Sequence, residues 1–353
     1  MRALFVASLA ACSGASPEVP SIDAATTADA PTADAAHLDP TPTTYRGTCD
    51  GSGALAIDFT HFIDLDDEDQ LVRLYARGRA DLVQMLDINA ELGLATGDEA
   101  DLEDVTRIGD RVFAITSHGR KASGSLDRTR YKLGAFTLGG APPAITLDGA
   151  GTSSQLLDQI LVSGNWDAPD ATVIAALNTA SKLGDNNDGD LAPELHGTNI
   201  EGLAHDATGR LLIGFRNPPV NGKAIVLAIT NPDAALTGTA RVAGAALLDL
   251  GGLTVRGMAY SEAHHAVLII GGSIASGGPF KLFTWTGALA DQPVEVATIT
   301  PPANSAPEAI VPYPGTLDVQ IVFDQGDVII GNTTCPNAPA TDRAFRDLIL
   351  SVP

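Results

Sequence analysis

The sequence predicts an all-β fold: a single β-propeller, with five blades favoured and a small helical insertion between the second and third repeats. Two observations lead to this prediction. A short pattern recurs along the chain at intervals typical of one four-stranded blade, and most intervals hold several short apolar segments of strand-like character. One interval is about twice as long as the others and contains helical periodicity as well. A degenerate sixth blade in that interval is the alternative.

The recurring pattern is five residues long, and four of its five central positions carry charged side chains. Successive central positions are 51, 98, 55 and 52 residues apart. A period near 50 residues is typical of one propeller blade, so the pattern marks the start of the innermost strand of each blade. The central residues are Ser52, Glu103, Glu201, Arg256 and Glu308.

Strand-like segments fill the units between these patterns. The first four units each offer four such segments, whereas the fifth offers only three, at 309–312, 319–323 and 344–352. We therefore expect residues 43–48 to supply the missing outer strand from the N-terminal side. This arrangement is the usual way in which a propeller closes its ring.

The long interval between Glu103 and Glu201 predicts a pair of helices. Its apolar residues recur with helical spacing, first around 156–161 and then around 173–183. We expect a helical insertion at about 152–184, with Trp166 at an exposed corner between the two helices.

The chain is strongly acidic, and this limits its partners. Lys and Arg number 21 against 43 Asp and Glu, for a net charge of −22. Such a surface repels phosphate backbones and anionic lipid headgroups, so we expect no nucleic-acid binding and membrane contact only through an anchor. Divalent cations and cationic or neutral ligands are easier partners. No apolar run long enough to span a membrane follows the first dozen residues. We also expect the protein to be a monomer.

The N-terminus resembles a bacterial lipoprotein signal peptide at residues 1–12. A basic residue precedes an apolar stretch that ends in Leu9-Ala10-Ala11-Cys12, and in signals of this kind the cysteine is lipidated. We expect an exported protein of a Gram-negative bacterium, either an outer-membrane lipoprotein or a protein of the periplasm or cell surface. Ordinary secretion, a misplaced start codon and a cytosolic location are the alternatives. Residues 13–44, rich in Ala, Asp, Pro and Thr, predict a disordered tether before a propeller domain at 45–353.

Two cysteines remain once Cys12 is assigned to lipid. Cys49 lies at the start of the repeats and Cys335 near their end. Because a ring must join its first and last blades, a disulfide between these two cysteines would lock the closure. Two free buried thiols are the alternative.

Several segments between about 50 and 330 resemble the bacterial family catalogued as domain of unknown function 3616. The segments that carry the resemblance are 66–69, 99–103, 117–120, 191–193, 199–204, 212–218 and 251–253 with Arg256. The resemblance implies a propeller-like fold and no established activity. The chain departs from the family pattern at Asp104 and Ala309, where glycine is usual, so these two turns are expected to be built differently. A weaker similarity, confined to Glu201-Gly202-Leu203-Ala204 and the glycine turn after it, is to the esterase-like phytase propellers.

Blade geometry predicts where a site lies. The start of the first strand and the end of the second lie on the same face of a blade, so both sets of residues converge on one rim of the central channel. Glu103, Glu201 and Glu308 are candidate catalytic groups or metal ligands on this rim. The candidate ligand-binding residues are Arg256, Arg216, Asp66, Asp324 and Trp166.

Clustered glutamates need compensating positive charge, because like charges raise one another's pKa. Arg216 and Arg256 supply it in a purely structural network, whereas a bound Ca²⁺ would supply it as a cofactor. His118 is a candidate general base, with a hydrogen-bonded loop histidine as the favoured interpretation.

A second calcium candidate is the segment that contains Asp185, Asp188 and Asp190. Its spacing does not fit an EF-hand loop, and a turn that ends the inserted helix is the other interpretation.

Two functions are consistent with these sequence features. The first is a module that binds a small molecule, a saccharide or a protein through the charged rim. The second is a Ca²⁺-assisted hydrolase of ester or phosphoester bonds. The chain lacks a G-x-S-x-G elbow, an H-E-x-x-H motif, a P-loop and a dinucleotide fingerprint. The binding module is therefore favoured, and whether the protein is an enzyme stays open.

Overall fold

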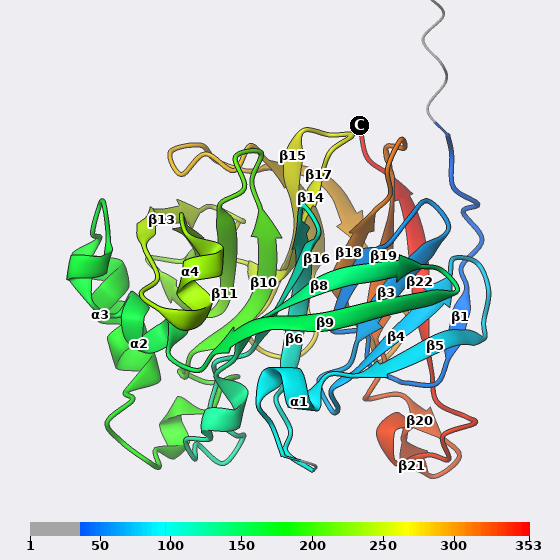
Figure 1. The fold of residues 1–353 in the computed structure, drawn as a ribbon, viewed down its shortest axis with the longest axis horizontal. Coiled ribbons are helices and arrows are strands. Elements are labelled where there is room, and N and C mark those ends of the chain that lie inside the picture. The colour runs from blue at the N-terminus through cyan, green and yellow to red at the C-terminus, as the bar shows by residue number, and fades with distance from the viewer. Residues whose placement is uncertain (1–35, 96) are drawn as a thin grey trace, which may run out of the picture. The chain divides into compact units, whose positions relative to one another are not determined.

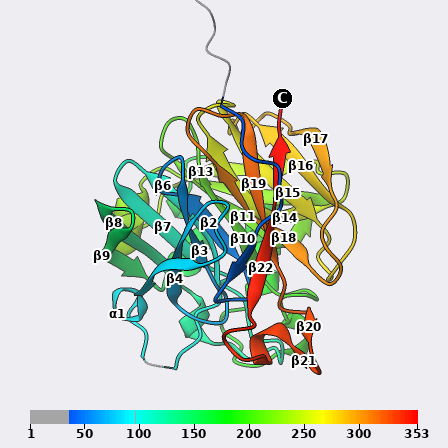
Figure 2. The same cartoon turned by 90° about the vertical axis from the view of Figure 1, so that its right-hand side faces the viewer.

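The computed structural model describes residues 36–95 and 97–353, which form a five-bladed β-propeller (Figures 1 and 2). Each blade is a four-stranded antiparallel sheet, and successive innermost strands contact one another around the ring. The predicted fold class and the count of five blades are confirmed, and the six-bladed alternative is wrong.

In the first four blades the strands follow one another from the innermost to the outermost in chain order. Blades 1 and 2 consist of β2 (Gly53–Ala56), β3 (His61–Leu65), β4 (Leu71–Ala76), β5 (Leu82–Asp87), β6 (Leu102–Ile108), β7 (Arg111–Thr116), β8 (Leu133–Ala141) and β9 (Ala144–Ser153). Blades 3 and 4 consist of β10 (Asn199–His205), β11 (Leu211–Val220), β12 (Lys223–Ile229), β13 (Val242–Leu248), β14 (Thr254–Ser261), β15 (Ala266–Gly272), β16 (Phe280–Trp285) and β17 (Val294–Ile299).

Blade 5 is built from both ends of the propeller domain. Its order is β18-β19-β22-β1, so the outermost strand comes from the N-terminal side, as predicted. Tyr45 pairs with Phe345 in the closing ladder, and a disulfide joins Cys49 to Cys335. The predicted closure and disulfide are therefore confirmed. The bounds are β18 (Ala306–Pro312), β19 (Asp318–Asp324), β22 (Ala344–Ser351) and β1 (Thr44–Arg46), with a hairpin of β20 (Ile329–Ile330) and β21 (Thr333–Thr334) before β22.

The long interval between the second and third patterns contains helices, as predicted. Asp170 caps the longest of them by accepting hydrogen bonds from the N–H groups of Thr172 and Val173. Short helical segments also occur in the loops of other blades. The helices are α1 (Asn89–Leu92), α2 (Leu156–Ile160), α3 (Ala171–Ser181) and α4 (Pro232–Thr237), with 3₁₀ turns at Arg128–Arg130, Ser163–Asn165, Gly189–Leu191 and Cys335–Asn337.

Trp166 does not lie at an exposed corner, which corrects the sequence prediction. It is 5% exposed, its Nε1 donates a hydrogen bond of 2.7 Å to the Ile160 carbonyl, and it forms a bridge with Val242 at the start of β13. A large apolar ring between two packed elements gains more free energy by burial than by exposure. The indole therefore anchors the insertion to blade 3.

Most of the N-terminal region lies outside the described residues. This applies to the predicted signal peptide at 1–12, to Cys12 and to residues 13–35 of the predicted tether. The described chain packs on blade 5 from Leu38 onward, earlier than the predicted boundary at 45. Leu38 is 5% exposed, and its N–H donates a 2.7 Å hydrogen bond to Asp318. Among the described residues, the helices are too short or too polar to cross a membrane.

The innermost strands approach each other so closely that glycine is required where they touch. A Cβ on Gly257 would lie 2.1 Å from the Glu308 carbonyl oxygen, and one on Gly53 would lie 2.7 Å from the Cα of Asp104. Such distances exclude any larger residue without a backbone shift. The ring of inner strands is therefore tightly packed around its axis.

Asp104, one of the two positions at which the sequence resemblance led us to expect a different turn, has a specific role in the structure. Its Oδ2 accepts hydrogen bonds from the N–H groups of Leu203 at 2.6 Å and Met258 at 3.2 Å, while Oδ1 accepts from Val105 at 2.8 Å. One buried carboxylate therefore joins the inner strands of blades 2, 3 and 4. We call this arrangement the axial pin.

Candidate functional site at the channel mouth

The central residue of the repeated pattern is a β-bulge in four of the five innermost strands. In blade 2 the pairing register passes from Leu102 directly to Asp104, so Glu103 has no partner on β7. Equivalent register shifts leave Glu201, Arg256 and Glu308 unpaired. A bulge adds an extra residue to one strand and re-aims its side chain. This local geometry explains why one position per blade is available to the channel.

These bulged residues line one cavity of about 790 Å³. The charged lining residues come from the starts of inner strands, the ends of second strands and the loops after them. They are Asp67, Asp101, Glu103, Arg130, Glu194, Glu201, Arg216, Arg256, Glu308, Asp324 and Asp327. Ser52, the central residue of the first pattern, is absent from this lining and is 2% exposed.

Three arginines of the cavity are paired with carboxylates. Arg216 donates a 2.6 Å hydrogen bond to Glu201, whose other oxygen lies 3.2 Å from Nε of Arg256. Arg256 also donates to Glu308, so it links the bulged residues of blades 3 and 5. Burial lowers the pKa of Arg256, while the Glu201 carboxylate opposes that shift.

The third arginine of the cavity, Arg130, lies in the loop after β7. It pairs with Asp101 at 2.9 Å and also contacts Glu99. These three arginines therefore have their positive charges matched within the protein.

Five carboxylates of the lining have no cationic partner among the described residues. They are Asp67, Glu103, Glu194, Asp324 and Asp327. Glu103 is the central member of this set, because it occupies the bulge of blade 2. Burial raises the pKa of Glu103 well above its ordinary value, and the carboxylates of Glu201, Asp101 and Asp67 raise it further. The cavity therefore holds eight acidic side chains against three arginines, and a bound cation would favour the ionised form of the acids that no arginine pairs with.

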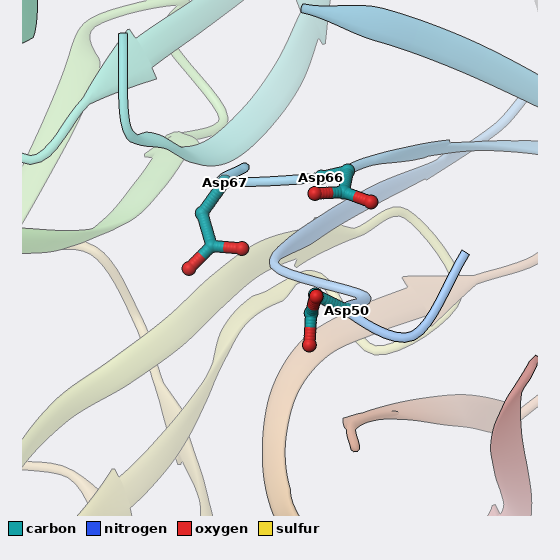
Figure 3. Close-up of side chains that lie close together, drawn as sticks. All are labelled: Asp50, Asp66 and Asp67. Carbon is teal, nitrogen blue, oxygen red and sulfur yellow. The ribbon is translucent and has the colours of Figure 1, made fainter. Parts of the chain in front are cut away.

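Three aspartates at the edge of this cavity form a tight cluster, which Figure 3 shows. One carboxylate oxygen from each of Asp50, Asp66 and Asp67 lies within 4.8 Å of the other two. In the described part of the chain this is the one set of three potential metal ligands that meets this distance, and the three glutamates do not form such a set. Asp67 lines the cavity, whereas Asp66 is 3% exposed and accepts a hydrogen bond from the Thr48 hydroxyl.

Other candidate residues lie away from the cavity. His118 is fully buried, Nδ1 contacts the Thr116 carbonyl at 2.9 Å, and the ring packs against Tyr131. Burial lowers the pKa of His118 to about 4, so it is neutral at pH 7. Neither His118 nor Trp166 is a lining residue of the cavity. A general-base role for His118 would therefore require a substrate to enter the protein interior.

The acidic segment with Asp185, Asp188 and Asp190 forms a turn after α3. Lys182 Nζ lies 3.1 Å from Asp185 and 2.8 Å from Asp188, and Asp188 accepts a hydrogen bond from the N–H of Asp190. The carboxylates of these three aspartates are not among the described groups that converge within 4.8 Å. The lysine therefore already compensates two of the three charges.

Some lining residues could not be found from the repeat. Arg130, Glu194 and Asp327 come from loops whose lengths differ between blades, so no fixed spacing marks them. Asp101, by contrast, is the first residue of the second pattern, two positions before Glu103. The pair Asp66-Asp67 was visible at the end of the second strand of blade 1. Because strand alternation ends there, the sequence does not tell which of the two carboxylates faces the channel.

Comparison with known proteins gives a family match over part of the chain. Residues 167–313 match the family described as Protein of unknown function (DUF3616). The resemblance predicted from the sequence motifs is confirmed over this stretch, which contains Glu201, Arg216 and Arg256. The similarity to esterase-like phytase propellers stays a prediction. No curated protein matches the chain.

Solved structures with a similar arrangement are distant in sequence. The glutaminyl cyclase of Myxococcus xanthus is 11% identical with a TM-score of 0.40, and the match covers 88% of this chain and 96% of that one. The PQQ-bound aldose sugar dehydrogenase of Streptomyces coelicolor is 12% identical with a TM-score of 0.41, over 88% and 99%. A luciferin-regenerating enzyme is 10% identical with a TM-score of 0.41, over 88% and 95%. At these values the similarities say nothing about activity.

Proposed function

We propose that the propeller is a binding module that takes a small, positively charged polar ligand, such as an amine, in the channel-mouth cavity. The observation that carries this proposal is the charge balance of the lining. Each of the three arginines is paired inside the protein, whereas five carboxylates have no cationic partner among the described residues. A cavity with a surplus of one charge attracts ligands of the opposite charge.

The lining chemistry also narrows the ligand class. Among the described residues that line the cavity there is no Phe, Tyr or Trp, so a sugar ring would lack the aromatic face on which it commonly stacks. Glu103 offers a carboxyl group that forms no ion pair with an arginine, and the lining also includes Asn199, whose amide N–H donates to Glu201 while its amide oxygen has no partner among the described residues. Carboxylate and amide oxygens both accept hydrogen bonds from an ammonium group.

A hydrolase that uses the three glutamates around one ion receives less support. Arg256 pairs with two of the three, Glu201 and Glu308, and each pairing reduces the charge available to a metal. The binding role needs no such rearrangement, and it is therefore the function we put forward.

A thermal-shift screen tests the binding role. Small amines, neutral sugars and carboxylates of similar size are added to the purified protein, and the melting temperature is followed as a function of concentration. We expect saturable increases with amines and none with carboxylates. Glu103→Gln should weaken amine binding roughly fivefold, because a charge pair in a partly solvated site contributes about 1 kcal/mol.

Glu295→Gln is the matched control, since Glu295 lies on β17 and pairs with Lys281 outside the cavity. This variant should retain the amine response in full. A stronger response to carboxylates than to amines, or an equal loss in both variants, would contradict the proposal.

We also propose that the protein is exported and anchored through Cys12. The Cys49–Cys335 disulfide is compatible with an oxidising compartment. Metabolic labelling with radioactive palmitate in a Gram-negative host tests this: the wild type should be labelled and Cys12→Ala should not. Equal labelling of the two would refute the anchor.

A further inference from the structure

We propose that Asp50, Asp66 and Asp67 bind a hard divalent cation such as Ca²⁺ at the junction of the first and last blades. The three residues come from two loops: Asp50 lies between β1 and β2, and the other two follow β3 (Figure 3). One oxygen of each carboxylate lies within 4.8 Å of the others, which places three anionic oxygens around a common space. All-oxygen ligand sets select Ca²⁺, Mg²⁺ or Mn²⁺ over softer metals.

The strongest indication of a ligand is the state of Asp50. Its side chain is buried, with 5% of the residue exposed, and it faces Asp66 and Asp67. Its side-chain hydrogen-bond partner is another acid, Asp324, and no described cationic side chain forms an ion pair with Asp50. Two carboxyl groups share a hydrogen bond only while one of them keeps a proton, so a bound cation that takes the place of this proton would compensate both. Asp67 lacks even this contact, since its Oδ1 is buried and has no hydrogen-bond partner among the described residues.

The surrounding backbone leaves room for this arrangement. A Cβ on Gly326 would lie 2.5 Å from Oδ1 of Asp50 and 3.3 Å from Oδ1 of Asp324. Glycine at this position therefore keeps space beside both carboxylates. Asp324 brings a fourth acidic group, from the end of β19 in blade 5, to the edge of the cluster. An ion here would neutralise charge contributed by both blades that meet at the closure.

Among the described residues, Arg73 is the cationic side chain next to the cluster, but its hydrogen bonds go to Asp69, which is outside the cluster. It lies 3.5 Å from Asp66 but donates hydrogen bonds of 2.6 and 3.1 Å to Asp69. Asp66 therefore has a cationic neighbour, whereas Asp50 and Asp67 have no positive charge beside their carboxyl groups among the described residues. This division makes Asp50 and Asp67 the informative positions for a test.

Isothermal titration of the purified full chain with CaCl₂, after EDTA treatment and removal of the chelator, tests the site. We expect one saturable site in the wild type and a loss of about tenfold or more in affinity in Asp50→Asn and in Asp67→Asn, because affinity follows the number of charged ligands. Gly326→Ala should also weaken binding, since it keeps every carboxylate but fills the adjoining space. Circular dichroism verifies that each variant is folded.

Asp190→Asn is the matched control, because Asp190 is an exposed residue of the acidic turn and its side chain has no recorded contact. This variant should bind Ca²⁺ like the wild type. The assignment would be overturned if the wild type had no saturable site, or if both Asp50→Asn and Asp67→Asn kept the wild-type affinity. Loss of binding in Asp190→Asn would also overturn it. Asp67 belongs to both the cavity lining and the cluster, but the two proposals are distinguishable, because Glu103→Gln should impair amine binding and still leave a saturable Ca²⁺ site.

Discussion

Replacement of Asp104 tests whether the axial pin holds three blades together. In Asp104→Ala the buried N–H groups of Leu203 and Met258 lose their acceptor, which lies 2.6 and 3.2 Å away in the wild type. A buried donor without an acceptor costs about 1–3 kcal/mol, so the two cross-blade donors together give roughly 2–6 kcal/mol.

One effect works against this loss. Burial raises the pKa of Asp104, whereas hydrogen bonds from the three N–H groups act in the opposite direction. Removing the carboxylate therefore relieves part of its desolvation penalty, and we expect a net destabilisation of about 2–4 kcal/mol. Asp104→Asn keeps one carbonyl oxygen for the two cross-blade donors and should lose about half as much.

Equilibrium unfolding in urea with the disulfide intact, followed by tryptophan fluorescence, measures these differences. Trp285 is 1% exposed and reports on blade 4. Asp110→Ala is the control, because Asp110 lies in the exposed turn after β6 and its side chain has no recorded partner. If Asp104→Ala were within about 0.5 kcal/mol of the wild type, the pin would have no energetic role and the reasoning would be refuted.

Three further predictions concern stability. Replacing both cysteines by serine should lower the free energy of unfolding by up to about 5 kcal/mol, since the bridge closes a loop of 286 residues; unchanged urea midpoints would contradict this. His118 has a folded-state pKa of about 4, below its unfolded value, so its contribution to stability is lost as pH falls from about 6.5 toward 4. Between pH 7 and 4.5 the free energy of unfolding should fall by about 2–3 kcal/mol less in His118→Gln than in the wild type. If the free energies of unfolding of the two proteins changed in parallel with pH, the lowered pKa of His118 would be excluded. Arg256→Met should cost about 3–5 kcal/mol, because Glu308 loses its cationic partner and Glu201 keeps only Arg216, whereas Arg128→Met, at an exposed pair with Asp158, should cost at most about 1 kcal/mol.

The fold was predictable because a propeller repeats one unit. The spacing of the pattern gave the blade count, and the shortage of one strand in the last unit led to the N-terminal strand that closes the ring. The positions of Cys49 and Cys335 at the two ends of the repeats predicted their pairing. Each of these features depends on chain order and spacing, which a sequence records directly.

The site was only partly predictable, because it depends on loops and on the direction of single side chains. Glu103, Glu201 and Glu308 were located by the repeat, but their pairing with arginines depends on distances across the channel. Asp50 belongs to the first pattern, yet nothing in the spacing brings it to Asp66 and Asp67. Trp166 was misplaced because the sequence of a loop does not reveal which neighbouring strand covers it.

A comparison of two probes of equal length and opposite charge tests the central claim most directly. 1,3-Diaminopropane and malonate each carry two charged groups on a three-carbon chain, and isothermal titration measures their binding to the wild-type protein at low and high salt. We expect saturable binding of the diamine that weakens as salt rises, and no binding of malonate. Tighter binding of malonate, or diamine binding that is insensitive to salt, would contradict an acidic receptor cavity at the channel mouth.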